Sequence, residues 1–379
     1  MTQEDIKIDR RALLQRFCSL VAIDNESFDE RAMADAVIAQ LSTLGLTAKE
    51  DDAAARIGGN AGNLYACLEG TGALADAEPI ALCAHLDSVA PARGKRALIA
   101  EDGSICSAGD TVLGADDLSA VAAMLETVRL LQEYRLPHRP TELLFTVCEE
   151  PYTLGSRALQ PERIPLRSRK IFVPDLTGQV GTAALAAPSI VALTITVTGR
   201  ASHAGFAPEK GIHAIAVAAR ALSKLKLGHV DSDTTVGIGT IHGGTVPNAV
   251  PEQCVLQGEI RGYADARVRE ELVKIRTIFE AEAQAAGATV QLVTEQRTRA
   301  YAIDAGAPIV TLFRDACRRA GVECLMTRTF GGSDANTFAE RGYQTLVIAN
   351  AMERIHSVQE RSHADELERL CRLLMALVT

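Results

Sequence analysis

The segment PIALCAHLD, residues 79–87, decides the fold class, because an apolar run ends there in a histidine and an aspartate. Two other segments follow the same pattern: LLFTVCEE (143–150) ends in two glutamates and IFVPD (171–175) ends in an aspartate. Short apolar runs of this kind are typical of buried strands in a parallel sheet. Open α/β sheets bind ligands beyond the carboxyl ends of their strands. The three segments therefore predict a doubly wound α/β domain with an acidic site at one sheet edge.

Two further polar positions extend this set. Asp116 and Asp117 precede the helical pattern AVAAML (120–125), and His356 follows the apolar run TLVIA (345–349) by a few residues. Several carboxylates and two imidazoles gathered at one sheet edge would repel one another and bury charge at high cost unless cations lay among them. The hypothesis that removes this cost is a pair of divalent metal ions.

Each motif also has an explanation without metal. His85 and Asp87 project to one side of a strand, which suits either a simple hydrogen bond or a metal-bound imidazole backed by a carboxylate. Asp is a favoured helix N-cap, so capping accounts for one member of the Asp116–Asp117 pair. The Glu149–Glu150 pair is either a solvated turn or a metal ligand beside a proton acceptor. The motifs taken singly leave these alternatives open.

Composition excludes several classes of function. The 379 residues carry a formal net charge of −9, whereas nucleic-acid binding needs a basic surface. We expect no membrane partner, because no apolar run reaches transmembrane length and the charged N-terminus lacks a signal-peptide core. The nine cysteines are scattered without a C-x-x-C pair, which argues against a disulfide framework and against a thiolate zinc site. The sequence predicts a reduced, cytoplasmic protein.

The pattern changes near Pro188, where a second domain is expected. Strands are predicted at 189–199, 235–241, 254–261 and 288–293, with helices at 211–225 and 266–286. This β-α-β-β-α-β order is typical of a ferredoxin-like α+β domain. We therefore expect a catalytic domain made of residues 1–187 and 300–379, with residues 188–299 inserted as a lid.

Taken in order, the motifs resemble a known family. They are AHLDSV, GADDLSA, CEEP, GRASHAG, VPNAVP, GEIR, GGSDAN and IHS, and they extend from His85 to His356. This set is similar to the dinuclear zinc exopeptidase family that contains peptidase T (a tripeptidase), carboxypeptidase G and aminoacylase, and most similar to its peptidase T-like branch. Leu118-Ser119-Ala120 departs from the Lys-x-Gly found in many relatives, but no expected ligand lies there.

The resemblance implies a role for each polar position. The roles are as follows: His85 and Asp175 bind one zinc ion, Glu150 and His356 bind the other, Asp116 bridges both, Asp87 orients His85, and Glu149 is the general base. A cis peptide bond is expected after Asp116. Zinc is the expected metal, although cobalt or manganese also suits mixed oxygen and nitrogen ligands.

The inserted domain is expected to contact the substrate. By resemblance, His203 and Asn248 polarise the scissile carbonyl, and Arg261 grips a substrate carboxylate, a task suited to guanidinium. A homodimer through this domain would let His203 act on the partner's site. The expected activity is tripeptidase or aminopeptidase action on small peptides. The alternatives are an N-acyl amino acid amidohydrolase, a glutamate-type carboxypeptidase, or a non-catalytic peptide-binding relative, which would be expected to lose ligands.

Overall fold

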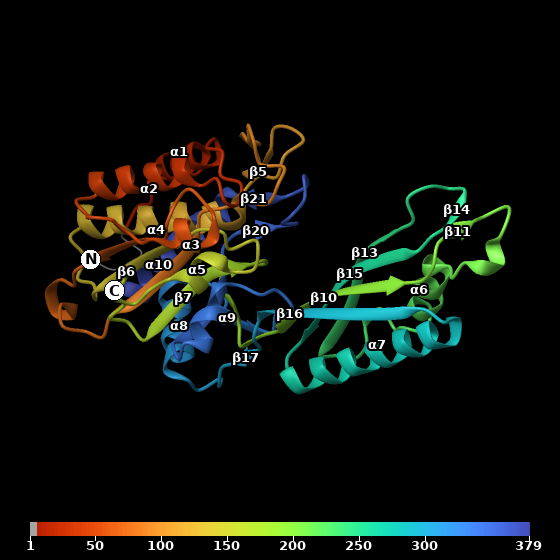
Figure 1. Cartoon of the computed structure of the whole chain (residues 1–379). Coiled ribbons are helices and arrows are strands. Elements are labelled where there is room, and N and C mark those ends of the chain that lie inside the picture. Colours follow the sequence, from red (N-terminus) through yellow and green to blue (C-terminus); the bar gives the residue numbers. More distant parts are fainter. Residues whose placement is uncertain (1–5) are drawn as a thin grey trace. The chain divides into compact units, whose positions relative to one another are not determined.

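The computed structural model describes residues 6–379, and these form two units. The first unit contains residues 6–186 together with Ala302–Thr379, and the second is Ala187–Tyr301 (Figure 1). Each unit has its own apolar core. No helix within residues 6–379 is both long and apolar enough to cross a membrane.

An eight-stranded sheet forms the centre of the first unit, in the order β1-β2-β6-β3-β7-β19-β8-β18. The strands are β1 (Lys49–Glu50), β2 (Leu64–Leu68), β6 (Thr141–Thr146), β3 (Ile80–His85), β7 (Lys170–Leu176), β19 (Gln344–Ala349), β8 (Thr182–Ala184) and β18 (Leu325–Thr327). The four middle strands, β6, β3, β7 and β19, run parallel to their neighbours in that group. Their carboxyl ends therefore meet at one edge, as the sequence predicted.

Helices and a smaller sheet surround this centre. The helices are α1 (Arg10–Val21), α2 (Arg31–Thr43), α3 (Ala53–Ile57), α4 (Ala115–Glu133), α5 (Leu154–Ala158), α8 (Pro308–Ala320), α9 (Asp334–Glu340) and α10 (Ala364–Val378), with a 3₁₀ turn η2 (Gly72–Leu74). The smaller sheet has the order β20 (Met352–Glu353), β21 (Arg361–His363), β5 (Ser104–Ser107) and β4 (Ala97–Ile99). α4 is buried almost throughout, because it packs on β3 and β7 and is itself covered by α1 and α10.

The second unit has the predicted ferredoxin-like arrangement. Its antiparallel sheet has the order β12 (Gly228–His229), β13 (Thr234–Gly243), β15 (Gln253–Gly262), β10 (Ser189–Thr198) and β16 (Thr289–Thr298). The helices are α6 (Ala214–Leu222) and α7 (Asp265–Ala286). The short elements are η3 (Pro208–Lys210), β11 (Ser202–His203) and β14 (Ala249–Val250). The chain passes from one unit to the other at β9 (Ala186–Ala187) and at β17 (Tyr301–Ala302). Both helices pack on the sheet around Ile195, Leu256 and Phe279, which forms this unit's core.

Candidate metal centre

Two groups of metal-ligating side chains lie at the carboxyl edge of the parallel strands. The groups are His85 with Asp116 and Asp175, and Asp116 with Glu150 and His356; in each, the ligand atoms lie within 4.8 Å of one another. They come from distant parts of the chain, since the groups draw on the ends of β3, β6 and β7, the first turn of α4, and the segment between β20 and β21. The five residues predicted as ligands are therefore brought together.

Asp116 belongs to both groups. Its Oδ1 lies 3.0 Å from His85 Nε2, and its Oδ2 lies 3.2 Å from His356 Nε2. Glu150 Oε2 lies 3.0 Å from the same His356 nitrogen, while Glu150 Oε1 is buried without a hydrogen-bond partner in the described part of the chain. A carboxylate facing two imidazoles, beside a second carboxylate with an unsatisfied oxygen, is a donor set suited to two divalent cations.

The protonation of the two histidines follows from their contacts. His85 Nδ1 donates to the backbone oxygen of Asp87 at 3.0 Å while Nε2 faces Asp116, so both ring nitrogens face acceptors. Burial disfavours the imidazolium, but the hydrogen bonds to Asp116 and Asp87 raise the pKa of His85 well above its usual value. Hydrogen bonds to Asp116 and Glu150 raise the pKa of His356 to about 10. Both histidines thus carry a proton when no metal displaces it.

The buried acids are perturbed in the complementary way. Burial and the charge of Asp116 raise the pKa of Asp175 well above its usual value, and burial and Asp175 do the same to Glu149. Burial acts on Asp116 in the same direction, yet the hydrogen bonds from His356 and His85 hold its pKa below its usual value. The raised pKa values show that ionisation of Asp175 and Glu149 is disfavoured in this cluster. Bound cations would supply the positive charge that stabilises the ionised carboxylates.

Asp87 holds the turn that carries the two glutamates. Its carboxylate accepts hydrogen bonds from the backbone N–H of Glu149 at 2.9 Å and of Glu150 at 3.2 Å, and from Ser27 Oγ at 2.7 Å. The same carboxylate lies 3.4 Å from His85 Nδ1, farther than the Asp87 backbone oxygen. Asp87 therefore faces His85 with both its backbone oxygen and its carboxylate, and the carboxylate also holds the backbone of Glu149, which belongs to neither ligand group.

The Asp116–Asp117 peptide is cis, as the resemblance implied. α4 begins after Gly114, and Asp116 and Asp117 themselves have non-helical backbone angles at a kink in its first turn. Asp117 accepts hydrogen bonds from the backbone N–H of His85 at 3.2 Å and from the side-chain amide of Asn350. It thereby ties the end of β3 to the end of β19.

The three predicted substrate-binding residues lie in the second unit. His203 and Asn248 are neighbours, because β11 pairs with β14 and Ala204 N–H donates to the Asn248 backbone oxygen at 3.1 Å. Arg261 lies near the other end of β15, where its Nε donates to Glu259 at 2.7 Å. His203 and Asn248 therefore lie next to each other, and Arg261 lies apart from both. Figure 1 shows β11 and β14 at one end of the second unit.

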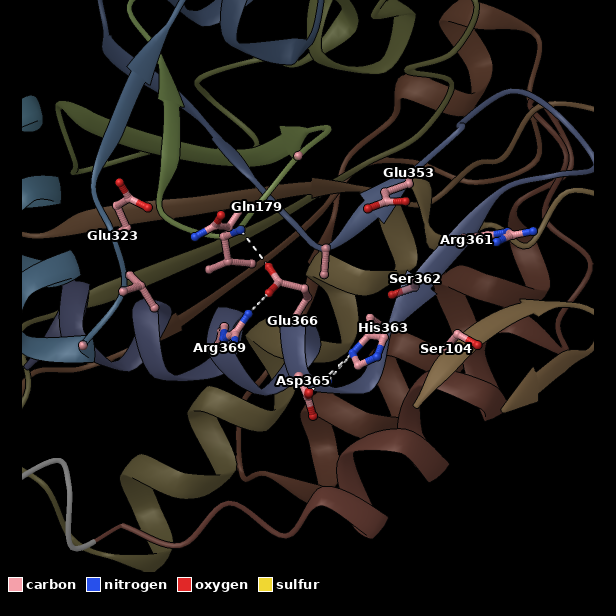
Figure 2. A pocket seen from close by; sticks show the side chains of 15 residues that line it. Ser104, Gln179, Glu323, Glu353, Arg361, Ser362, His363, Asp365, Glu366 and Arg369 are labelled. Carbon is pink, nitrogen blue, oxygen red and sulfur yellow. Dashed lines mark hydrogen bonds and ion pairs between the residues drawn. The ribbon is translucent and has the colours of Figure 1, made fainter. Parts of the chain in front are cut away.

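A separate cavity of about 600 Å³ lies in the first unit, lined by residues from the β7–β8 turn, β21 and the start of α10. Figure 2 shows Glu366 paired with Arg369, and Glu366 Oε2 also accepts a hydrogen bond from the backbone N–H of Val180 at 2.8 Å. None of the five ligand candidates lines this cavity. The metal centre is therefore distinct from it.

Two buried groups beside the centre could not be found from the sequence. Glu360 accepts hydrogen bonds from three backbone N–H groups at the start of α4. Lys95 is buried with its Nζ donating to Asn25 Oδ1, and burial lowers the pKa of its ammonium group to about 8. In sequence each lies in a polar stretch next to an arginine, a pattern that usually indicates a solvated surface.

Comparison with known proteins finds peptidases. Residues 185–286 match a model described as a peptidase dimerisation domain, and residues 63–234 match a model of peptidase family M28. A tripeptidase structure from Staphylococcus aureus aligns with a TM-score of 0.92 and 30% identity over 98% of each chain. The aminopeptidase PepT structure from Bacillus cereus gives a TM-score of 0.87 and 32% identity, again over 98% of each chain.

Curated sequences give the same result. An uncharacterised protein of Bacillus subtilis is 32% identical over 98% of both chains, and carboxypeptidase G2 of Pseudomonas is 27% identical over 86% of this chain and 78% of its own. The fold and the ligand groups define a metal-dependent hydrolase. Within that class, the chain belongs to the M20 family of peptidases, because the solved relatives match its whole length whereas the M28 match covers only part of it. The family resemblance of the motifs is confirmed.

Proposed function

We propose that this protein is an exopeptidase that hydrolyses small peptides, with tripeptides as the leading substrates and two zinc ions as the cofactor. The observation that carries the proposal is the contact of the two Asp116 oxygens with two different histidines. In this proposal His85 and Asp175 hold one ion, Glu150 and His356 hold the other, and Asp116 bridges them. Free cysteines throughout the chain support a reducing, cytoplasmic location.

In the proposed mechanism, Glu149 carries the proton between the attacking water and the leaving amine. Two bound divalent ions would polarise the scissile carbonyl and acidify water. Glu149 lies beside the ligand groups, is 8% exposed, and is held through its backbone N–H by Asp87. It accepts a proton from the attacking water and returns that proton to the leaving amine. Burial and the charge of Asp175 raise its pKa, which makes the carboxylate a better proton acceptor.

His203 is oriented as a hydrogen-bond donor. Its Nδ1 accepts from the backbone N–H groups of Gly205 and Phe206, both at 3.1 Å. An Nδ1 that accepts must be unprotonated, so the proton of the neutral ring lies on Nε2. His203 Nε2–H and the side-chain amide of Asn248 would then donate to the carbonyl oxygen as negative charge develops on it.

The distance within the second unit supports a homodimer. β15 begins at Gln253, a few residues after β14, and Arg261 lies near its other end. At about 3.3 Å per residue, Arg261 is roughly 25 Å along the strand from Gln253. An extended tripeptide spans only about 10 Å. One inserted unit therefore cannot bring Arg261 and the His203–Asn248 pair to the same small substrate. In a dimer, Arg261 would come from one subunit and His203 with Asn248 from the other.

A release assay tests the activity. Purified protein, with its metal content measured on the same sample, would be given tripeptides, dipeptides and N-acylated amino acids. Preferred cleavage of tripeptides supports the proposal, whereas preference for N-acyl amino acids or for peptides ending in glutamate would favour the amidohydrolase or carboxypeptidase alternative. Glu149→Ala should keep both ions and lose hydrolysis, while Glu162→Ala, which removes an exposed carboxylate of the same unit, should change neither.

Mixing two inactive variants tests the dimer. In a heterodimer of Glu149→Ala and His203→Ala, one site has an intact base and receives an intact histidine from the partner. Subunit exchange should therefore recover roughly one quarter of wild-type activity, since half of the dimers are mixed and each has one complete site. If His203 serves its own subunit, no mixture has a complete site and activity stays absent.

A further inference from the structure

Glu360 is a buried carboxylate that binds the start of α4. Only 1% of its surface is exposed. Its Oε2 accepts from the backbone N–H groups of Leu113 and Gly114 at 2.8 Å each, and its Oε1 accepts from the N–H of Asp116 at 2.9 Å. All three donors belong to the turn that presents the carboxylate shared by the two ligand groups. A buried carboxylate with three backbone donors is a strong local restraint.

Glu360 also belongs to the segment that carries His356. Within the segment between β20 and β21, Ser357 Oγ donates to Arg354 O at 2.7 Å, and Glu360 N–H donates to Ser357 O at 3.0 Å. His356 itself is 51% exposed on its side chain and has a φ of 59°. Glu360 joins this segment to the Asp116 turn through its three hydrogen bonds.

The group of His85, Asp116 and Asp175 is also held by contacts that do not involve Glu360. His85 and Asp175 lie on neighbouring strands β3 and β7, whose register is set by the parallel sheet. Asp117 anchors the same turn to β3 from the other side, through the backbone N–H of His85. The group of His85, Asp116 and Asp175 therefore has supports that do not involve Glu360, whereas Glu360 joins the segment of His356 to the Asp116 turn.

A buried cation lies against the same turn. A Cβ on Gly114 would lie 3.2 Å from Lys95 Nζ and 3.1 Å from Ser88 Oγ, so the ammonium group packs directly on the turn that Glu360 binds. Its charge offsets part of the cost of burying the Glu360 carboxylate. The turn is thus held between an anion and a cation that belong to neither ligand group.

We propose that Glu360 is a positioning residue that sets the spacing of Asp116 and His356, and that it thereby controls the affinity of the second metal ion and not that of the first. The proposal rests on the two-metal function proposed above. Loss of a residue that orients metal ligands typically weakens metal binding about 10- to 100-fold. We expect a loss of that size confined to one of the two binding steps.

The test is a metal titration of the metal-free protein with Zn²⁺ against a competing chelator. Glu360→Gln keeps the size of the side chain but places an amide N–H₂ against a backbone donor. One binding step should weaken about 10- to 100-fold, and it should be the step that His356→Ala removes. The fall in kcat should be restored by excess Zn²⁺ with little change in KM, which damage to the fold would not allow. Glu353→Gln, an exposed carboxylate before His356, is the matched control and should bind both ions normally.

Three results separate the outcomes. If both steps are unchanged in folded Glu360→Gln, or both weaken equally, the positioning role is overturned while the two-metal function stands. If the wild-type protein binds fewer than two ions, the proposed function fails and the role of Glu360 fails with it. If circular dichroism shows that Glu360→Gln is unfolded, Glu360→Asp replaces it, because it keeps the charge, withdraws the carboxylate by one methylene, and carries the same expectation.

Discussion

The affinity of the metal-free protein for metal should rise with pH, whereas the stability of the same metal-free protein should fall with pH. In the metal-free chain, the Nε2 atoms of His85 and His356 face carboxylate oxygens, which favours a proton on each of them. The pKa of His85 is raised well above its usual value, and that of His356 is raised to about 10. Each ion must therefore displace at least one proton at neutral pH.

The magnitude follows from this proton count. Each displaced proton makes binding about tenfold tighter per unit rise in pH, since one pKa unit equals about 1.4 kcal/mol. Two ions should release at least two protons, and the raised pKa values of Asp175 and Glu150 add to that number. The affinity for the pair of ions should therefore rise about 100-fold or more per pH unit between about pH 6 and 8.

The stability of the metal-free chain should change in the other direction. A histidine whose pKa is raised on folding stabilises the fold fully below its unfolded pKa of about 6.5 and loses that contribution as the pH rises through its folded value. For His356 this window extends from about 6.5 to about 10. The Tm of the chelator-treated protein should fall between about pH 6.5 and 8, below the range where Lys95, with its pKa lowered to about 8, acts in the other direction, and the increase in Tm on adding metal should grow.

Isothermal titration calorimetry in two buffers of different protonation enthalpy measures the protons released, and thermal unfolding with and without chelator measures the stability. His356→Gln serves as the comparison, because it removes one of the two protons and should lower the count by about one. A proton release near zero, together with an affinity that stays flat with pH, would refute the protonated-histidine description of the centre.

Three further predictions concern single residues. Asp87→Asn should lower kcat while metal stays bound, and should cost roughly 1.5–3 kcal/mol of unfolding free energy, because a buried charged acceptor of two backbone N–H groups is lost; unchanged urea unfolding would contradict this. Gly114→Ala should destabilise the fold more than Gly94→Ala, since both glycines have positive φ but only Gly114 has atoms within 4 Å of the added Cβ; equal midpoints would show that the contact with Lys95 does not matter. Arg261→Ala should lower kcat/KM far more for peptides with a free α-carboxylate than for their amides, and equal losses would remove its proposed role.

The ligand candidates at the ends of strands could be predicted from the sequence pattern alone. His85, Glu150 and Asp175 follow apolar runs, and parallel strands bring their carboxyl ends to one edge. The role of Asp116 as a shared ligand came from the resemblance, since an Asp-Asp pair before a helix also indicates a cap. In the structure the Asp116 carboxylate faces two histidines, and the Asp117 carboxylate accepts hydrogen bonds from the His85 N–H and from Asn350.

Contacts between segments distant in sequence could not be predicted. Glu360 lies in a polar stretch, and nothing local indicates that it is buried against residues 113–116 more than 200 positions earlier. The neighbouring positions of His203 and Asn248 depend on the pairing of two-residue strands, which are too short to produce a pattern. The separation of Arg261 from them depends on the register of β15, which a motif does not encode.

The insertion of Ala187–Tyr301 between Asp175 and His356 has a consequence for synthesis of the chain. A ribosome completes β7 long before it completes β19, its neighbour in the middle of the sheet. At about 5–20 residues per second, β7 remains an unpaired edge for on the order of ten to thirty seconds. During that interval the inserted unit can fold around its own core, while the half-built sheet exposes a strand edge prone to aggregation. Nascent chains stalled before residue 344 should therefore be the species that most needs a chaperone.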